Sequence, residues 1–309
     1  MALGPVEITL AAIYALLVAA TVTVAVLRRV RPAADLGELA ARVRTWWVIV
    51  TVITLALLLG RTAVIGLFAF VSYLALKEYL SLIPTRRADR RVLFWAYLSI
   101  PVQYLWIGVS WYGMFIIFIP LYMFLFLPMR MVTVGETRGF LKAVGTLHWG
   151  LMITVFAVSH LAYLVTLPAA PGWPAAGRGV LLYLLILTEG NDVAQYLWGK
   201  ALGRTRAAPT VSPGKTTAGL LGGLGTTTAV AVLLAPHLTP LSAAHAAMAG
   251  VIVSLGGFMG DLTISAVKRD VGVKDSGDTL PGHGGILDRL DSLTYAAPLF
   301  VHFLRFLYT

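Results

Sequence analysis

The chain has 309 residues, of which 58% are hydrophobic and 12% are charged. A soluble domain usually carries about 25% charged residues, so this composition excludes a water-soluble globular domain and predicts a polytopic membrane protein. The absence of cysteine excludes disulfides and thiolate metal sites, and the net charge of +10 is typical of cytoplasmic loops near anionic lipid rather than of nucleic-acid binding.

About ten stretches of the sequence are apolar enough to cross a bilayer as helices, which takes roughly 20 residues each. The first is too long for a cleaved signal peptide and is expected to remain as a helix. Only Gly60 and Arg61 separate the second from the third, which predicts a tight helical hairpin. The ten stretches, which together predict an all-α integral membrane protein, are 6–27, 46–60, 62–81, 93–110, 112–130, 147–167, 179–198, 216–235, 244–267 and 293–308.

A mixed segment, residues 34–47, lies between the first two spans and combines Leu, Ala and Trp with Asp, Glu and Arg. This pattern predicts an amphipathic helix on the inner leaflet, with Trp46 and Trp47 at the interface. The chain is therefore expected to have four parts. They are an additional N-terminal transmembrane helix (1–33), the interfacial helix (34–47), the N-terminal transmembrane helices (48–178), and a C-terminal transmembrane region (179–309) that the motifs below mark as catalytic.

Basic residues alternate between the connections of these spans. Clusters of Lys and Arg follow the first, third, fifth, seventh and ninth spans, whereas the other connections carry almost no charge apart from Arg61 and Arg178. Because basic loops remain on the cytoplasmic side, the alternation supports the count of spans. It also predicts cytoplasmic loops after the odd-numbered spans and both termini outside, in the cell inner (plasma) membrane.

The first polar motif is EGNDVAQYLWGKALGR, residues 189–204. Glu189, Asn191 and Asp192 lie within an apolar span, where a charge costs several kcal/mol and usually serves a function. We interpret these residues as part of a site. The alternative is a pair of carboxylates at a helix end that reach water.

The second motif is PTVSPGKTTAGLLGG, residues 209–223. It is not a Walker phosphate loop, because that loop requires glycine where this chain has Pro209 and follows a strand that the sequence does not predict. We expect a simpler phosphate site in which Lys215 acts as a point charge. Hydroxyl groups at a helix start would complete it: Ser212, Thr216 and Thr217. The alternative is a helix start beside a lysine that follows the positive-inside pattern.

The third motif, residues 265–295, holds two Lys, two Arg, five Asp and one His. Asp261 precedes it within the ninth span, after glycines that permit close approach of a backbone or ligand. Asp288 and Asp291 are three residues apart and share one face if a helix begins near residue 287. Carboxylates beside Lys and Arg suit a divalent cation and a polyphosphate, and ligation by oxygen alone favours Mg²⁺ over zinc. His283 is a base, a phosphate donor or a turn residue.

The order of residues in this third motif resembles the complete signature of the phosphatidate cytidylyltransferases, the CDP-diacylglycerol synthases. The wider resemblance covers residues 45–309 and includes the Ser-Pro-x-Lys-Thr segment at 212–216. The chain departs from the family pattern at residues 193–195, which are Val-Ala-Gln where Ser-Gly-Ala is common. The matching positions are Ser265-x-Val267-Lys268-Arg269, Lys274-Asp275-x-Gly277 and Leu280-Pro281-x-His283-Gly284-Gly285-Ile286-x-Asp288-Arg289-Leu290-Asp291.

This resemblance implies transfer of CMP from CTP to phosphatidate, giving CDP-diacylglycerol and pyrophosphate, on the cytoplasmic side of the C-terminal half. Its implied partners are CTP, phosphatidate or a related lipid phosphate, the membrane and a second copy of the chain, but no nucleic acid. The implied catalytic residues are Asp261, Lys268, Arg269, Lys274, His283 and Asp288. The implied Mg²⁺ ligands are Asp261, Asp288 and Asp291. The implied substrate contacts are Asp192, Tyr196, Ser212, Lys215, Thr216, Asp275, Gly284, Gly285 and Arg289.

Two alternatives stay open at this point. The first is a cytidylyltransferase or a CTP-dependent kinase that acts on another membrane lipid. The second is a transporter in which Asp192 and Asp261 belong to a cation path. The sequence also leaves open whether a second metal or a monovalent cation such as K⁺ accompanies Mg²⁺.

Overall fold

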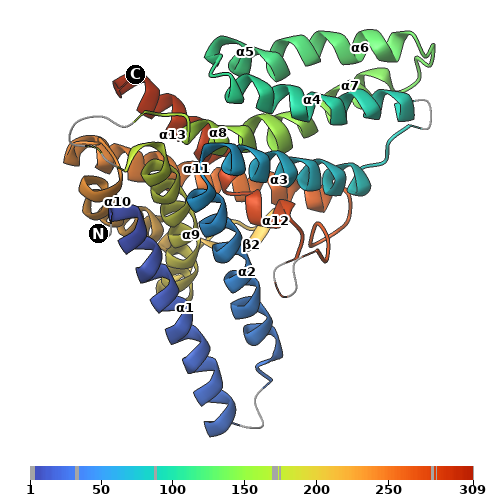
Figure 1. The fold of residues 1–309 in the computed structure, drawn as a ribbon. Helices are drawn as coiled ribbons and strands as arrows, with labels where there is room; N and C mark the ends of the chain where they lie inside the picture. The colour runs from blue at the N-terminus through green and yellow to red at the C-terminus, as the bar shows by residue number, and fades with distance from the viewer. Residues whose placement is uncertain are drawn as a thin grey trace.

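Ten long helical segments, one for each predicted span, run through the computed structural model (Figure 1). The structure describes residues 4–31, 35–86, 89–168, 173, 175–279, 282 and 284–308. The segments are α1 (Pro5–Val30), α2 (Gly37–Leu59), α3 (Arg61–Leu82), α4 (Arg90–Gly108), α5 (Tyr112–Ile117) with η2 (Phe118–Met123) and α6 (Phe124–Val132), α7 (Phe140–Leu151) with η3 (Met152–Phe156) and α8 (Ala157–Leu164), α9 (Ala176–Leu202), α10 (Thr217–Leu238), α11 (Ala243–Asp270) and α13 (Leu293–Tyr308).

Within the described residues, seven of these segments are long and apolar enough to cross a membrane: α1, α2, α3, the α5–α6 unit, the α7–α8 unit, α10 and α11. The other three are α4, α9 and α13. The α13 helix has only 16 residues, and α9 carries the polar residues Glu189, Asn191 and Asp192 in its interior. The prediction of a mostly helical chain with several membrane-spanning segments is therefore confirmed.

Arginine side chains link some of the connections between the helices to one another. Arg86, between α3 and α4, donates to the carbonyl oxygens of Glu136 and Arg138, between α6 and α7. Arg61, the first residue of α3, donates to the carbonyl oxygens of Ile107 and Gly108 at the end of α4. The connection after α3 thus contacts the one after α6, and the start of α3 contacts the end of α4.

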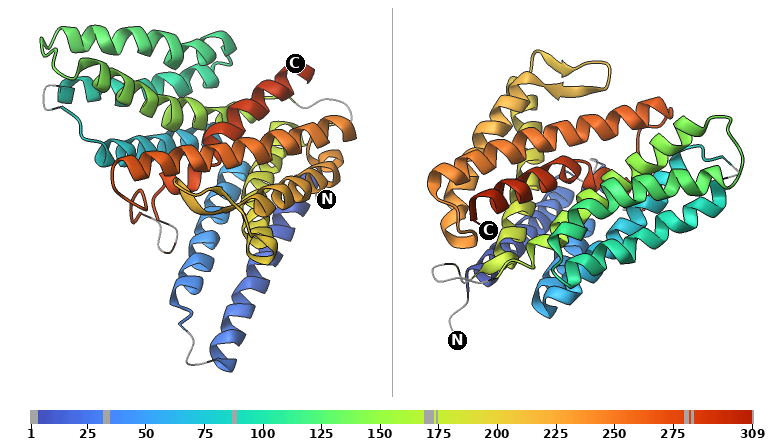
Figure 2. Two further views of the ribbon diagram at one scale, coloured as in Figure 1. Left: turned by 180° about the vertical axis from the view of Figure 1, so that it is seen from behind. Right: turned by 90° about the horizontal axis from the view of Figure 1, so that it is seen from above.

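The α1–α2 hairpin extends beyond the rest of the molecule (Figures 1 and 2). Residues 37–47 are the first part of α2, so the segment predicted as a separate interfacial helix continues directly into the second span. Trp47 donates its ring N–H to the Thr21 hydroxyl at 3.0 Å, which places it against α1. Gly60, with φ at +98°, forms the predicted tight connection between α2 and α3.

Asn191 joins the three longest helices of the C-terminal region. Its buried carbonyl oxygen accepts from the hydroxyl of Thr227 on α10 at 3.1 Å and from that of Ser254 on α11 at 2.7 Å. A buried amide with two partners fixes the register of the helices that carry it. This joint sets the position of Asp192, the next residue along α9.

A small β-hairpin interrupts the helices and shows that the all-α prediction was incomplete. Strands β1 (Arg206–Ala208) and β2 (Ser212–Thr216) pair antiparallel between α9 and α10. The strands are too short to show an alternating apolar pattern, so they could not be predicted from the sequence. The hairpin places the Ser-Pro-Gly-Lys-Thr segment beside the C-terminal end of α9 and the start of α10, away from α4–α7 (Figure 2).

Candidate active site

Several predicted site residues lie together with other polar side chains in two clusters, both of which include or contact residues of α11. We call the first the pocket cluster: Asp192, Lys215, Asp261 and Asp291. We call the second the loop cluster: Glu78, Lys268, Ser276 and Asp288. The short helix α12 (Leu287–Leu290) and the loop that precedes it connect the two.

A cavity of about 590 Å³ opens between the C-terminal end of α9, the β-hairpin and the start of α10. Five residues predicted to bind substrate line it: Asp192, Tyr196, Ser212, Lys215 and Thr216. Three further cations, which the signature does not include, also line it: Lys200, Arg204 and Arg206. A cavity with four cations at its wall suits a ligand that carries several negative charges.

Lys215 connects this cavity to the carboxylates behind it. Its Nζ lies 2.5 Å from Asp261 Oδ2 and 3.4 Å from Gln195 Oε1. Burial opposes its charge, but Asp261 and Asp192 outweigh burial and raise the pKa of Lys215 above its ordinary value. Thr216 caps α10, because its hydroxyl accepts from the Gly219 N–H at 3.0 Å, as expected for a hydroxyl at a helix start.

Three carboxylates belong to the pocket cluster, and among the described residues an ion pair joins one of them, Asp261, to Lys215. Asp192 Oδ2 accepts from the Ser292 hydroxyl at 2.9 Å, whereas its buried Oδ1 has no partner in the described part of the chain. Burial, with the charges of Asp261 and Asp192, raises the pKa of Asp291 well above its ordinary value. A side chain at Gly260 would overlap the Asp291 carbonyl, so this glycine allows α11 to approach the acid.

The pocket cluster contains three carboxylates, and carboxylate oxygens are the ligands that Mg²⁺ prefers. A cation bound there would relieve the repulsion among these acids and give Asp192 Oδ1 a partner. Among the described residues, no three His, Cys, Asp or Glu side chains already stand close enough together to enclose a metal, and Asp261 Oδ2 is paired with Lys215. The residues fit the cation by type and charge.

Asp288 belongs to the loop cluster and not with Asp261 and Asp291. Its Oδ1 lies 2.6 Å from Lys268 Nζ, and its Oδ2 accepts from the backbone N–H of Ser276 and Gly285 at 2.8 and 3.0 Å. Burial works against ionisation, but these bonds prevail and lower the pKa of Asp288. A helix does begin at Leu287, as the shared face of Asp288 and Asp291 requires, but the two acids have different partners. Asp291 Oδ1 accepts from the Ser292 N–H at 2.7 Å.

Glu78 was not identified from the sequence, although it is the centre of the loop cluster. It is buried near the end of α3 and accepts bonds from four groups of the signature loop. They are the N–H groups of Ile286 and Leu287, both at 2.9 Å, and the hydroxyls of Ser276 and Thr279. The available signal was an acidic residue within an apolar span, the same signal that marked Asp192.

The remaining predicted residues lie outside the two clusters. Arg269 donates to the carbonyl oxygens of Val211 and Val273, so it ties the loop after α11 to the β-hairpin. Lys274 and Asp275 are exposed. Gly284, with φ at +77°, forms the turn before α12, and Gly285 leaves no room for a side chain beside the Glu78 carboxylate. His283 lies outside the described residues.

Arg289 lies at the polar end of an apolar groove of about 200 Å³. The groove is walled by α2, α3 and α9, and Trp46, Val52 and Leu67 are among its lining residues. Glu189 lines it as well, and the charge of Arg289 acts on both Glu189 and Asp192. Arg289 Nε is buried without a hydrogen-bond partner in the part of the chain that the structure describes.

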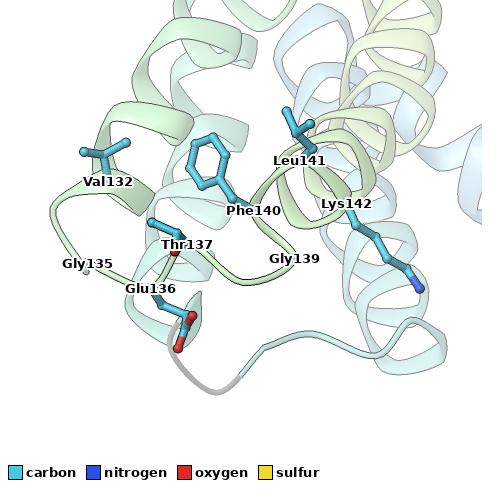
Figure 3. Close-up of a pocket in the computed structure, with 8 residues that line it drawn as sticks. All are labelled: Val132, Gly135, Glu136, Thr137, Gly139, Phe140, Leu141 and Lys142. Atoms are coloured by element: carbon cyan, nitrogen blue, oxygen red, sulfur yellow. The ribbon is translucent and has the colours of Figure 1, made fainter.

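A separate cavity of about 610 Å³ lies at the connection between α6 and α7 (Figure 3). Residues from Val132 to Lys142 line it, and none of the predicted site residues is among them. The predicted site residues that line a cavity described above are in the basic cavity at the end of α9 or, in the case of Arg289, in the apolar groove.

A protein-family model described as "Cytidylyltransferase family" matches residues 40–307 of the chain. The chain is 45% identical over 300 residues to "Uncharacterized protein YnbB" of Escherichia coli (strain K12), covering 97% of this chain and 98% of that protein. It is 41% identical over 148 residues to the phosphatidate cytidylyltransferase of Pseudomonas aeruginosa, covering 45% and 54%, and 48% identical over 113 residues to that of Synechocystis sp., covering 36% and 38%. The last two alignments span about half or less of the named enzymes.

Proposed function

Because the chain belongs to the cytidylyltransferase family, we propose that it transfers CMP from CTP to phosphatidate and releases pyrophosphate. The choice of lipid is supported by the similarity to the phosphatidate cytidylyltransferases of Pseudomonas aeruginosa and Synechocystis sp.. The full-length similarity to the Escherichia coli protein carries no information on substrate.

One observation carries the proposal: a single turn of α9 serves both the basic cavity and the apolar groove. Asp192 lines the cavity and Glu189, three residues earlier, lines the groove. A charged nucleotide fits the first and an acyl chain fits the second, so the two substrates would meet at this turn. Positioning reactive groups next to each other is the main requirement for phosphoryl-type transfer.

The reaction itself asks little acid–base chemistry of the protein. An anionic oxygen of the lipid phosphate attacks the α-phosphorus of CTP, the new oxygen–phosphorus bond forms, and the bond to the departing pyrophosphate breaks. Lys200, Arg204 and Arg206 would hold the triphosphate, and Arg289 would hold the lipid phosphate. These cations act by electrostatic stabilisation of the transition state.

Mg²⁺ is the cation that we propose for the pocket cluster, held by Asp192, Asp261 and Asp291. When bound, it would offset the charge that grows on the departing pyrophosphate. We propose Asp192 as a ligand in place of Asp288, the ligand that the resemblance implies, because Asp288 already has Lys268 and two backbone N–H groups as partners.

The membrane arrangement that goes with this chemistry puts the site at the cytoplasmic face of the inner membrane. CTP is a cytosolic solute and phosphatidate resides in the leaflet, so a site at that face gives access to both. The basic connections after the odd-numbered segments favour this orientation. A homodimer stays a prediction from the resemblance alone.

Labelled CTP separates the proposed reaction from its alternatives. Purified protein in vesicles that contain phosphatidate would receive CTP labelled at either the α- or the γ-phosphorus, with Mg²⁺. Label from the α-position in the lipid, with release of pyrophosphate, supports CMP transfer. Label from the γ-position would instead indicate a lipid kinase. Failure of both labels to reach any of several lipid phosphates would refute a CTP-dependent transferase and leave a transporter as the remaining candidate.

A further inference from the structure

The buried carboxylate of Glu78 connects the N-terminal half of the molecule to the signature loop. Glu78 belongs to α3, whereas all four of its donors lie about 200 residues later in the chain. Its Oε1 accepts from the Leu287 N–H and the Ser276 hydroxyl, and its Oε2 accepts from the Ile286 N–H and the Thr279 hydroxyl. Both oxygens are therefore fully used as acceptors within one loop.

The Ser276 hydroxyl couples Glu78 to Asp288. It lies within hydrogen-bond distance of Glu78 Oε1 and 2.9 Å from Asp288 Oδ2, but it has one proton and donates to one of them at a time. The Ser276 N–H donates to Asp288 as well, at 2.8 Å. A shift of Glu78 would therefore move the loop, and with it the Asp288–Lys268 pair.

We propose that Glu78 is a positioning residue for the transfer reaction, an inference that rests on the proposed function. Its carboxylate fixes the four residues that donate to it, and these hold Asp288, Lys268 and the start of α12 in place. Asp291 follows α12 directly, so the contacts of Glu78 also set the position of Asp291 relative to Asp261. The N-terminal helices thus supply a part of the active site and not only a membrane anchor.

Glutamine is the sharpest replacement because it keeps the size of the side chain. The amide NH₂ must take the place of one oxygen, and each oxygen faces a backbone N–H that cannot turn away. In one orientation the NH₂ opposes the Leu287 N–H, and in the other it opposes the Ile286 N–H. Either orientation leaves a buried donor without an acceptor, which backbone groups tolerate poorly.

The test compares full-length wild type with E78Q and with the control E136Q, which removes an exposed acid between α6 and α7. For each protein, kcat and the KM for CTP are measured per folded molecule, and amide hydrogen exchange is measured over residues 276–287 and 189–204. We expect E78Q to lower kcat roughly 10- to 100-fold, as small misplacements do, with less than about a threefold change in KM. Exchange should accelerate in 276–287 alone.

Unchanged kcat in folded E78Q, or equal exchange in 276–287, would overturn the proposal. If E78Q does not fold, Ser276→Ala removes one shared hydroxyl and should show the same pattern at smaller size. Normal kcat and normal exchange in that variant would equally contradict the proposed positioning role of Glu78. Should wild-type protein transfer no CMP at all, the proposed function fails, while the exchange measurement still decides whether Glu78 fixes the loop.

Discussion

The loop cluster and the pocket cluster contain the same kinds of side chain but differ in how their charges are satisfied. In the loop cluster, Asp288 has Lys268 and two backbone N–H groups, and Glu78 has four neutral donors. In the pocket cluster, three acids share Lys215, and one buried oxygen of Asp192 has no partner among the described residues. Acids whose charges are compensated by neighbouring groups stabilise the fold. Acids that repel one another favour a bound ligand that compensates their charge.

The largest expected effect is loss of turnover when an acid of the pocket cluster is neutralised. Asp261→Asn removes a charge that we place at the reacting phosphates, and loss of one such group costs on the order of 10²–10³-fold in rate. Thermal unfolding should change little, since the lost pair with Lys215 is offset by reduced repulsion of Asp192 and Asp291. Transfer rates from α-labelled CTP and thermal unfolding midpoints test this. An unfolding midpoint that falls together with the rate would mean that Asp261 stabilises the fold and does not act at the phosphates.

Asp288→Asn provides the contrast from the loop cluster, with a loss of both stability and rate. Lys268 is only 8% exposed, and removing one partner of a buried ion pair costs about 3–5 kcal/mol. The lowered pKa of Asp288 means that its contribution is fully present at neutral pH and is lost as pH falls toward that pKa. The wild-type unfolding midpoint should therefore drop on acidification more steeply than that of the variant; identical pH dependence would contradict a supporting role.

The fold was predictable where it depends on local composition. Each predicted span has a helical segment, because an apolar run of sufficient length is visible in the sequence itself, and seven of these segments are long and apolar enough to cross a membrane within the described residues. The continuity of α2 was missed because charged residues such as Arg42 and Arg44 precede the apolar part, and a change in composition resembles the end of an element. The β-hairpin was missed because its strands are only three and five residues long.

The site was predictable in its membership more than in its arrangement. The sequence pointed to Asp261, Asp288 and Asp291 as possible ligands, but it could not show that Asp288 pairs with Lys268 while Asp291 accepts from the Ser292 N–H. Glu78 could not be assigned to the loop, because its partners lie far away in the sequence and only the packing of α3 brings them together. A sequence motif therefore indicates which residues belong to the candidate site, but only the tertiary structure shows which of them contact one another.

A smaller effect is expected at the wall of the basic cavity, where charge serves binding more than reaction. Arg206→Gln removes a cation from β1 that lines the cavity, and a charge-assisted hydrogen bond contributes about 1.5–3 kcal/mol. We expect the KM for CTP to rise roughly tenfold with kcat nearly unchanged. Arg91→Gln, which removes an exposed cation on α4, is the matched control. An equal rise in both variants would mean that the overall charge, and not the cavity, attracts the nucleotide.

The smallest effect concerns the apolar groove, and it tests whether the lipid reaches the pocket cluster from that side. Val52 lines the groove on α2, and Val52→Trp would fill part of its volume of about 200 Å³. Leu55, three residues later on the same helix, is exposed and is not among the lining residues, so Leu55→Trp adds the same bulk elsewhere. Each buried CH₂ of an acyl chain contributes about 0.8 kcal/mol, so loss of one or two such contacts should raise the KM for long-chain phosphatidate several-fold. The KM for CTP and for a short-chain lipid should remain unchanged. If both tryptophan variants behave alike, the acyl chain lies elsewhere, and Arg289 would then lose its role as the contact for the lipid phosphate.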